Sequence, residues 1–250
     1  MFRFASFIIL AFSFYSFMEF PQLNPKPLEK ITFPASDGLI VTADLYFVND
    51  SLPYMVLCHQ AGYSRAEYAE TAGKFCHLGY NSLAIDARSG YEVNGVKNET
   101  AALAAAKKKP TAYLDAEKDI LAAVDYCYNK SGKKVFLVGS SYSASLALKI
   151  AATNKKVKAV MAFSPGEYFG TKLKLKDAIA NLSVPVFVTS SKEEANDVTA
   201  LIENVKSKIK NQFVPTSKGK HGSSCLWKDN PGYHEYWFAI MMFMKQLPSP

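Results

Sequence analysis

The sequence predicts an α/β fold in which one mainly parallel, eight-stranded sheet carries helices on both faces. Short runs of continuously apolar residues alternate with longer segments of helical periodicity, which is the pattern of parallel strands buried on both sides. The chain has 250 residues, 49% of them hydrophobic and 13% aromatic, which suits one large core and excludes a disordered chain. We therefore expect a single α/β domain over residues 28–248, with no large lid.

The first expected elements are two strands at the edge of the sheet. Residues 30–33 and 39–47 flank the turn 36–38, and they lie too close together for a crossover, so they should pair antiparallel. Six further strands are expected at residues 54–58, 82–85, 135–138, 157–163, 184–189 and 212–214.

The helices are predicted from caps and from the spacing of apolar residues. Ser64 is an N-cap and Gly79 a stop signal for a helix over residues 64–78. The apolar residues Leu114, Ile120, Leu121 and Val124 lie mostly three, four or seven apart. Further helices are expected at residues 111–128, 141–152, 197–208 and 233–247, and residues 89–110 should form an excursion near the strand ends.

The N-terminus predicts export. Arg3 supplies one positive charge, and residues 4–18 then carry no charge and are mostly Phe, Ile, Leu and Ala. This stretch is shorter than the roughly 20 residues that span a membrane. Residues 1–20 are therefore predicted to be a secretory signal, with an uncleaved N-terminal membrane anchor as the alternative. The expected location is periplasmic or secreted.

Charge and cysteine content bear on the class of partner. The net charge is +7, but the lysines are dispersed and no nucleic-acid module accompanies them, so no nucleic-acid partner is expected. The cysteines are widely spaced and lack metal-ligand spacing, so no metal site is expected. Buried free thiols and disulfides both remain open for Cys58, Cys76, Cys127 and Cys225.

The segment 135–144, VFLVGSSYSA, carries the strongest chemical signal. A buried strand leads directly into a turn and a helix, which places a nucleophile in strained backbone at the top of a sheet. The residues two before and two after that nucleophile must be small, because strand and helix nearly touch there. Gly139 and Ser143 meet this condition around Ser141, the candidate nucleophile. Ser143 also passes on size but lies a step further into the helix.

A serine hydroxyl needs a base to take its proton and an acid to orient that base. His221 lies in a loop of small residues after the last expected strand and is the candidate base. The expected chain order is serine, acid, histidine. Three acidic residues that follow the strand at 184–189 satisfy this order: Glu193, Glu194 and Asp197.

The same rim of the sheet should supply an oxyanion hole and pocket residues. One donor should be the backbone N–H of Tyr142, and Gln60, in the loop after the third strand, is the candidate for the second. Tyr168 and Arg88 follow strand ends and are candidates for shaping the pocket. Arg88 either pairs with a substrate carboxylate or forms an ion pair with a neighbouring loop.

Together these motifs resemble the α/β-hydrolase superfamily, and within it the dienelactone-hydrolase-like proteins, over roughly residues 28–247. Besides the serine turn, the resemblance rests on residues 59–62, 86–90, 163–166 and 221–224. It implies Ser141 as the nucleophile, His221 as the base and Glu194 as the acid. Dienelactone hydrolases proper have a cysteine at the nucleophile position, so a serine there implies a broader esterase.

The expected function is hydrolysis of carboxylic esters, thioesters or small lactones through an acyl-enzyme on Ser141. The substrate should be a small acyl compound, and the reaction requires no metal or organic cofactor. The alternatives are a peptidase or an acyltransferase on the same scaffold, or a binding protein that kept the fold and lost the acid.

Overall fold

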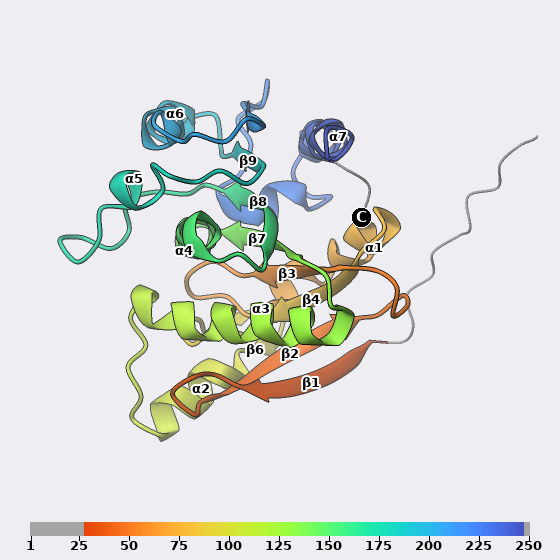
Figure 1. The fold of residues 1–250 in the computed structure, drawn as a ribbon, viewed down its shortest axis with the longest axis vertical. Helices are drawn as coiled ribbons and strands as arrows, with labels where there is room; N and C mark the ends of the chain where they lie inside the picture. Colours follow the sequence, from red (N-terminus) through yellow and green to blue (C-terminus); the bar gives the residue numbers. More distant parts are fainter. Residues whose placement is uncertain (1–27, 248–250) are drawn as a thin grey trace, which may run out of the picture.

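One eight-stranded sheet runs through the computed structural model, which describes residues 28–247 (Figure 1). Its strands are β1 (Glu29–Pro34), β2 (Ile40–Tyr46), β3 (Tyr54–Cys58), β4 (Asn81–Ile85), β7 (Val135–Ser140), β8 (Val157–Phe163), β9 (Val186–Thr189) and β10 (Lys210–Phe213). They lie in the order β1-β2-β4-β3-β7-β8-β9-β10. The pairs β1–β2 and β2–β4 are antiparallel, and every later pair is parallel. The predicted mainly parallel sheet is confirmed.

Helices cover both faces of this sheet. They are α1 (Ala72–His77), α2 (Glu99–Ala106), α3 (Glu117–Ser131), α4 (Tyr142–Thr153), α5 (Leu175–Ala178), α6 (Ala195–Ile202) and α7 (Tyr233–Met244). Helices α3, α4 and α6 pack into one hydrophobic cluster, and α1 and α7 into a second cluster on the opposite face. Strand β7 is buried along its whole length, because its side chains alternate between the two clusters.

Several helical segments differ from the expected ones at their ends. The helix expected at residues 64–78 is a 3-10 turn, Arg65–Tyr68, followed by α1, and Ser64 caps only the 3-10 turn. The helix expected at 111–128 likewise begins with a 3-10 turn, Tyr113–Ala116, before α3. The helix expected at 197–208 begins two residues earlier and ends at Ile202, and β10 begins at Lys210 instead of residue 212.

The excursion expected at residues 89–110 contains a hairpin and a helix. Strands β5 (Glu92–Val93) and β6 (Val96–Lys97) form the hairpin, and α2 follows it. Helix α2 packs beside β2, where the Thr42 N–H donates a hydrogen bond to Thr100 Oγ1 at 2.9 Å. The N–H groups of Tyr91 and Glu92 donate to the carbonyls of Tyr63 and Gly62 in the loop after β3, so the excursion begins near the strand ends, as predicted, and α2 then covers the antiparallel end of the sheet.

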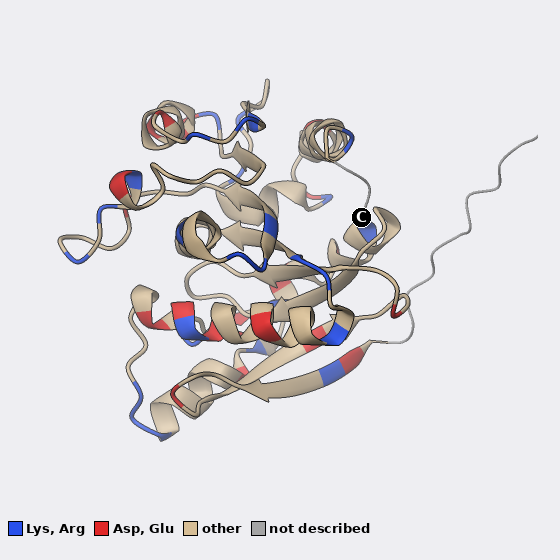
Figure 2. Cartoon of the chain, in the orientation of Figure 1, with Lys and Arg blue, Asp and Glu red and all other residues tan. Residues whose placement is uncertain are grey.

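All four cysteines are buried free thiols in the structure. Burial raises the pKa of each thiol, so the thiolate form is disfavoured. Lys and Arg are spread over many elements, and α3 carries acidic and basic residues along its length (Figure 2). Within residues 28–247, no helix is long and apolar enough to cross a membrane. The predicted signal or anchor at residues 1–20 lies outside the described residues.

Candidate active site

Ser141 occupies the sharp turn between β7 and α4. Its backbone has φ 57° and ψ −125°, a left-handed conformation that residues other than glycine rarely adopt. The Ser141 N–H donates to the Phe163 carbonyl of the neighbouring strand at 2.8 Å, which holds the turn in place. Ser141 is 7% exposed. This is the strained strand–turn–helix geometry that the sequence predicts for a nucleophile.

Ser143, the other serine that met the size condition, has a structural role. Its hydroxyl donates to the Cys58 carbonyl at 2.7 Å and accepts from the Ser140 N–H at 2.9 Å. The side chain is fully buried. Ser143 therefore ties the end of β3 to the turn after β7, and Ser141 remains the candidate nucleophile.

Gly139 is required by the close approach of β7 and α4. A Cβ at this position would lie 2.5 Å from Ala144 Cα and 2.5 Å from the Ser143 carbonyl oxygen. We expect Gly139→Ala to lower the free energy of unfolding, measured in urea, by about 1–3 kcal/mol because backbone must move. Gly73→Ala is the control: nothing lies within 4 Å of a Cβ there, and this α1 position should gain up to about 1 kcal/mol. Equal stability of the two variants would contradict the close contact.

Glu194 and His221 are paired at the same rim of the sheet. His221 Nδ1 donates a hydrogen bond to Glu194 Oε1. Glu194 Oε2 accepts from Ser164 Oγ at 2.8 Å, from the Ser191 N–H at 3.0 Å and from Ser191 Oγ at 2.8 Å. The carboxylate is thus fixed by β8 and β9 while it orients the imidazole.

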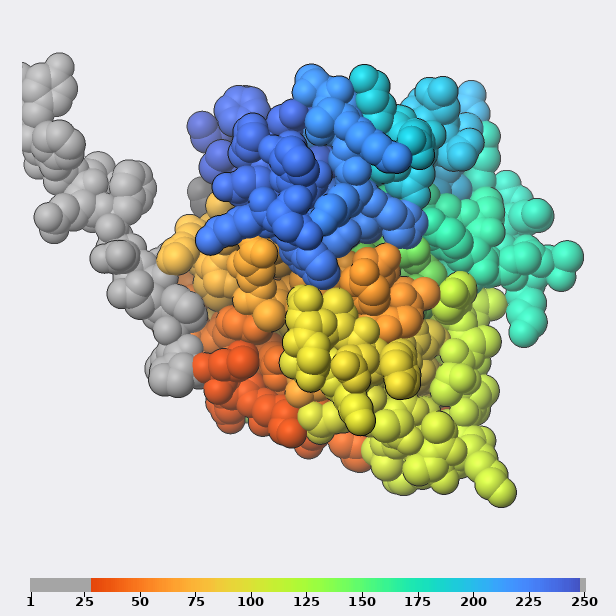
Figure 3. All heavy atoms as spheres, turned by 180° about the vertical axis from the view of Figure 1, so that it is seen from behind, coloured from red at the N-terminus to blue at the C-terminus, as the bar shows by residue number. Residues whose placement is uncertain are grey.

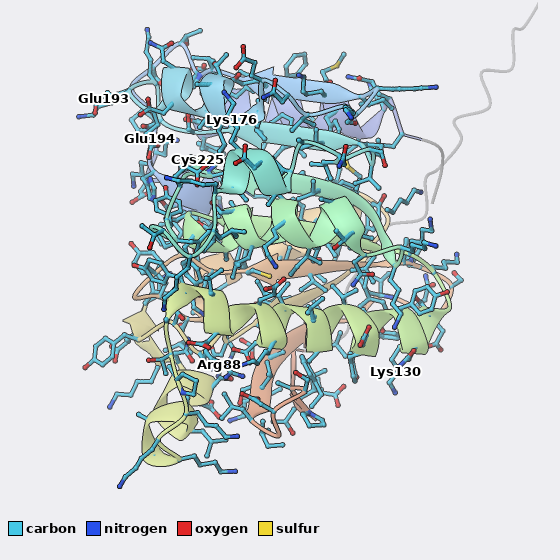
Figure 4. The ribbon with its side chains drawn as sticks, turned by 60° about the vertical axis from the view of Figure 1, so that its left-hand side comes forward. Arg88, Lys130, Lys176, Glu193, Glu194 and Cys225 are labelled. Carbon is cyan, nitrogen blue, oxygen red and sulfur yellow. The ribbon has the colours of Figure 1, made fainter. Side chains whose placement is uncertain are left out.

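The other two candidate acids do not contact His221 in the described structure. The Glu193 side chain is 73% exposed, and it forms an ion pair with Lys218 at 3.4 Å. Figure 4 shows Glu193 projecting outward while Glu194 lies closer to the body of the molecule. Asp197 lies in the first turn of α6. Of the three open alternatives, the structure brings Glu194 to the imidazole.

The electrostatics of the pair suit a general base. Burial raises the pKa of the Glu194 carboxyl, but hydrogen bonds from His221, Ser191 and Ser164 outweigh burial and lower it to about 2. The hydrogen bond to Glu194 raises the pKa of His221. A carboxylate at Nδ1 therefore stabilises the imidazolium that forms when the other ring nitrogen accepts a proton.

The loop that carries His221 is attached to the nucleophile turn. The Gly222 N–H donates to Ser164 Oγ at 2.9 Å, and the Ser223 N–H donates to Ser140 Oγ at 2.8 Å. Gly222 has φ +68°, and a Cβ there would lie 2.5 Å from Ser140 Oγ, so this position requires glycine. Seen from behind, the blue C-terminal segment rests on the orange segment that follows β3 (Figure 3). These contacts place His221 beside the turn that holds Ser141.

The loop after β3 has a backbone amide without an acceptor one residue later than the predicted oxyanion donor. The Gln60 N–H donates to Glu67 Oε2 at 2.7 Å, so it is already paired and the assignment of Gln60 is wrong. Within the described residues, the N–H groups of Ala61 and Tyr142 have no hydrogen-bond acceptor. Two unpaired amides near a nucleophile are the requirement for an oxyanion hole.

Three shallow hollows lie beside Glu194, Tyr168 and His221. Tyr168 separates a hollow of about 480 Å³, lined by Glu194 and Leu201, from one of about 350 Å³, lined by Tyr113 and Phe169. His221 borders a third hollow of about 500 Å³. Tyr168 donates to the Ser164 carbonyl at 2.9 Å, which fixes its ring between the first two. The predicted position of Tyr168 at the pocket agrees with this arrangement.

Comparison with known protein families shows which family this chain belongs to. The model of the dienelactone hydrolase family matches residues 45–222, more than half of the chain. The chain belongs to the dienelactone hydrolase family. This match supports a hydrolase. Among curated proteins, none matches the sequence.

Solved structures share the fold of this dienelactone hydrolase family member. An esterase of Pyrococcus furiosus is 16% identical, with a TM-score of 0.69 over 90% of this chain and 91% of its own. A dienelactone hydrolase from Anabaena variabilis is 14% identical, with a TM-score of 0.69 over 90% of this chain and 100% of its own. A 2,6-dihydroxy-pseudo-oxynicotine hydrolase is 16% identical, with a TM-score of 0.62 over 87% of this chain and 67% of its own. The predicted α/β-hydrolase fold is confirmed.

In this dienelactone hydrolase family member, Arg88 is a structural residue. Its guanidinium is 2.8 Å from Asp119 and 2.7 Å from Asp37, and its side chain is fully buried (Figure 4). The proposed pairing of Arg88 with a substrate carboxylate is therefore replaced by its alternative, an ion pair with neighbouring elements. Two carboxylates already satisfy the guanidinium, and Arg88 lines none of the three hollows beside Tyr168 and His221.

Breaking this buried pair should destabilise the protein. We expect Asp119→Ala to lower the free energy of unfolding by about 3–5 kcal/mol, because a buried charge loses its partner. Asp125→Ala on the same helix is the control, since Asp125 is 55% exposed and pairs with Lys156 at the surface. It should change stability by less than about 1 kcal/mol. Urea denaturation measures both, and a mild Asp119→Ala phenotype would contradict the structural role.

Three residues at this site were not predicted from the sequence. Ser164 joins Glu194 to the histidine loop, Ala61 supplies the unpaired amide, and Glu67 accepts the Gln60 N–H. Ser164 lay in a motif that supported the resemblance but had no assigned role. Glu67 lies seven residues after Gln60, and no sequence motif there indicates that its carboxylate turns into the site.

Proposed function

We propose that this chain is a serine hydrolase that cleaves carboxylic esters, thioesters or small lactones. The convergence of three elements carries the proposal: Ser141 on its strained turn, the Glu194–His221 pair, and a histidine loop attached to the residue before Ser141. Membership of a hydrolase family supports the same class of reaction.

The reaction proceeds in two halves. Ser141 Oγ attacks the substrate carbonyl carbon while His221 Nε2 accepts the hydroxyl proton and Glu194 stabilises the imidazolium. The carbonyl oxygen becomes an oxyanion that accepts hydrogen bonds from the Ala61 and Tyr142 N–H groups, each worth about 2.7–4 kcal/mol. His221 then protonates the leaving alcohol or thiol as its bond to the acyl carbon breaks. Water, deprotonated by His221, attacks the acyl-enzyme and releases the acid and Ser141.

The shape of the site favours small acyl compounds. The hollows around Tyr168 have volumes of about 350 and 480 Å³. They are lined by apolar groups of Leu201, Phe169 and Leu114, which suit a short acyl chain or ring.

Labelling with a fluorophosphonate tests this function directly. The probe reacts with an activated serine, so we expect one adduct per chain, located on Ser141 by peptide mass spectrometry. His221→Gln should label far more slowly because the base is lost. Hydrolysis of p-nitrophenyl acetate, with no hydrolysis of aminoacyl p-nitroanilides, is expected in parallel. Absence of an adduct would favour the binding-protein alternative, and cleavage of the anilides would favour a peptidase.

A further inference from the structure

Glu67 is a buried acid that the reaction as described does not use. It lies in the 3-10 turn Arg65–Tyr68 after the loop that carries Ala61, and it is fully buried. Burying a carboxylate is costly unless donors surround it. The hydrogen-bond partners of Glu67 must therefore explain why it is buried.

Three separate parts of the site donate hydrogen bonds to this carboxylate. Glu67 Oε2 accepts from the Gln60 N–H at 2.7 Å, next to the unpaired amide of Ala61. Glu67 Oε1 accepts from Ser140 Oγ at 2.7 Å, next to the candidate nucleophile. It also accepts from Ser223 Oγ at 2.6 Å, two residues after His221. One side chain thus joins the oxyanion loop, the nucleophile turn and the histidine loop.

The hydrogen-bond pattern favours a charged Glu67. Burial raises the pKa of the Glu67 carboxyl above its usual value, and hydrogen bonds from Ser223, Ser140 and Gln60 offset only part of that rise. Each of the three partners donates, and the Gln60 N–H is unable to accept a proton in return. A carboxylate that accepts from three donors is satisfied, whereas its protonated form would force a hydroxyl to reorient.

The imidazoles near Glu67 are those of His221 and His59. Burial raises the pKa of the neighbouring side chains of Cys58, Tyr68 and Cys225, which keeps them neutral. His59 Nε2 lies 2.9 Å from the Ala87 backbone nitrogen and His59 Nδ1 lies 2.8 Å from the Gln60 carbonyl oxygen, so backbone groups hold that ring. The charged groups that face His221 are Glu194 and Glu67, while the nearby lysines pair with other carboxylates: Lys218 with Glu193, and Lys220 with Asp229.

We propose that Glu67 is a positioning residue that holds the oxyanion loop, the nucleophile turn and the histidine loop in register and supplies a buried negative charge that favours protonated His221. The inference rests on the proposed function, because it assigns the imidazolium of His221 to the reaction. Charge and position act together: the same carboxylate that fixes the Ser223 segment lies within electrostatic reach of the ring.

Glu67→Gln separates charge from volume. Glutamine keeps the size of the side chain and one acceptor oxygen but loses the negative charge. We expect kcat for a short ester to fall by about 10²-fold, as for a small misplacement of catalytic groups. The acid limb of the kcat/KM profile should move to lower pH, because loss of a nearby anion lowers the pKa of His221. Glu70→Gln is the control, because Glu70 lies three residues further along at a more exposed position. It should leave both kcat and the acid limb of the kcat/KM profile unchanged.

The titration of His221 supplies a second readout that does not require turnover. NMR should show the His221 imidazole titrating at lower pH in Glu67→Gln than in the wild type, with the resonance assigned from its loss in His221→Gln. This keeps the two proposals distinguishable. An inactive wild type that fluorophosphonate leaves unlabelled refutes the serine hydrolase, whereas an active wild type with no shift in His221 on Glu67→Gln refutes the role of Glu67.

The remaining outcomes also test the role of Glu67. Loss of activity in Glu67→Gln with an unmoved His221 titration would reduce Glu67 to a packing residue and overturn the proposal. If Glu67→Gln does not fold, Ser223→Ala removes one tie to the histidine loop while leaving the charge. That variant should lower kcat with little change in KM, and wild-type kcat would overturn the positioning role.

Discussion

Ser141→Ala should reduce the turnover of a short p-nitrophenyl ester by about 10⁴- to 10⁶-fold while the protein remains folded. The substitution removes the atom that forms the acyl-enzyme and leaves the backbone turn, the Glu194–His221 pair and the unpaired amides in place. Residual rate enhancement should come from the oxyanion donors alone. Single-turnover kinetics on purified protein measures the loss, and circular dichroism checks the fold.

Ser143→Ala is the matched comparison for Ser141→Ala. The Ser143 hydroxyl holds Cys58 and Ser140 together, so its loss should cost about 1–3 kcal/mol of stability. Activity per folded molecule should nevertheless stay within about tenfold of the wild type. Loss of the Ser143 hydroxyl shifts the catalytic groups only slightly and leaves the nucleophile in place. The reverse pattern, an active Ser141→Ala and a dead Ser143→Ala, would transfer the nucleophile to Ser143.

The site residues that could be predicted are those set by local sequence. The serine turn is recognisable because small residues at fixed spacing around Ser141 are dictated by contact between consecutive elements. His221 was predictable because it follows the last strand of a parallel sheet, where strand ends converge. The acid was narrowed to three residues, and the choice of Glu194 needed the fold, since Ser164 and Ser191 orient it.

The predictions that failed depended on contacts that the local sequence pattern does not reveal. The sequence predicts Gln60 as an oxyanion donor, but its N–H donates to Glu67. A turn of 3-10 helix brings that carboxylate within hydrogen-bonding distance. Arg88 lost its role in binding because Asp37 and Asp119, far apart in the sequence, both face it. The helix expected at residues 64–78 is broken for a related reason: the 3-10 turn lets Arg65 reach Asp86 at 2.8 Å.

Glu194→Gln should lower kcat by about 10⁴-fold, the loss that accompanies a neutral amide in place of the triad acid. The amide no longer stabilises the imidazolium and favours the wrong tautomer of His221. Since Glu194 raises the pKa of His221, its removal lowers that pKa, and the acid limb of kcat/KM should move to lower pH. A pH–rate profile on a short ester measures both effects. Glu193→Gln is the control, because Glu193 is exposed and pairs with Lys218.

The same variant should change stability in a defined pH window. The pKa of Glu194 is lowered on folding, so its contribution is present above its ordinary value of 4.5 and is lost as the pH falls toward about 2. The pKa of His221 is raised on folding, so its contribution is present below its ordinary value of 6.5 and is lost as the pH rises through the folded value. The wild type should therefore exceed Glu194→Gln in stability most clearly between pH 4.5 and 6.5. A stability difference that is constant with pH would show that Glu194 and His221 do not interact as charges, even if activity is lost.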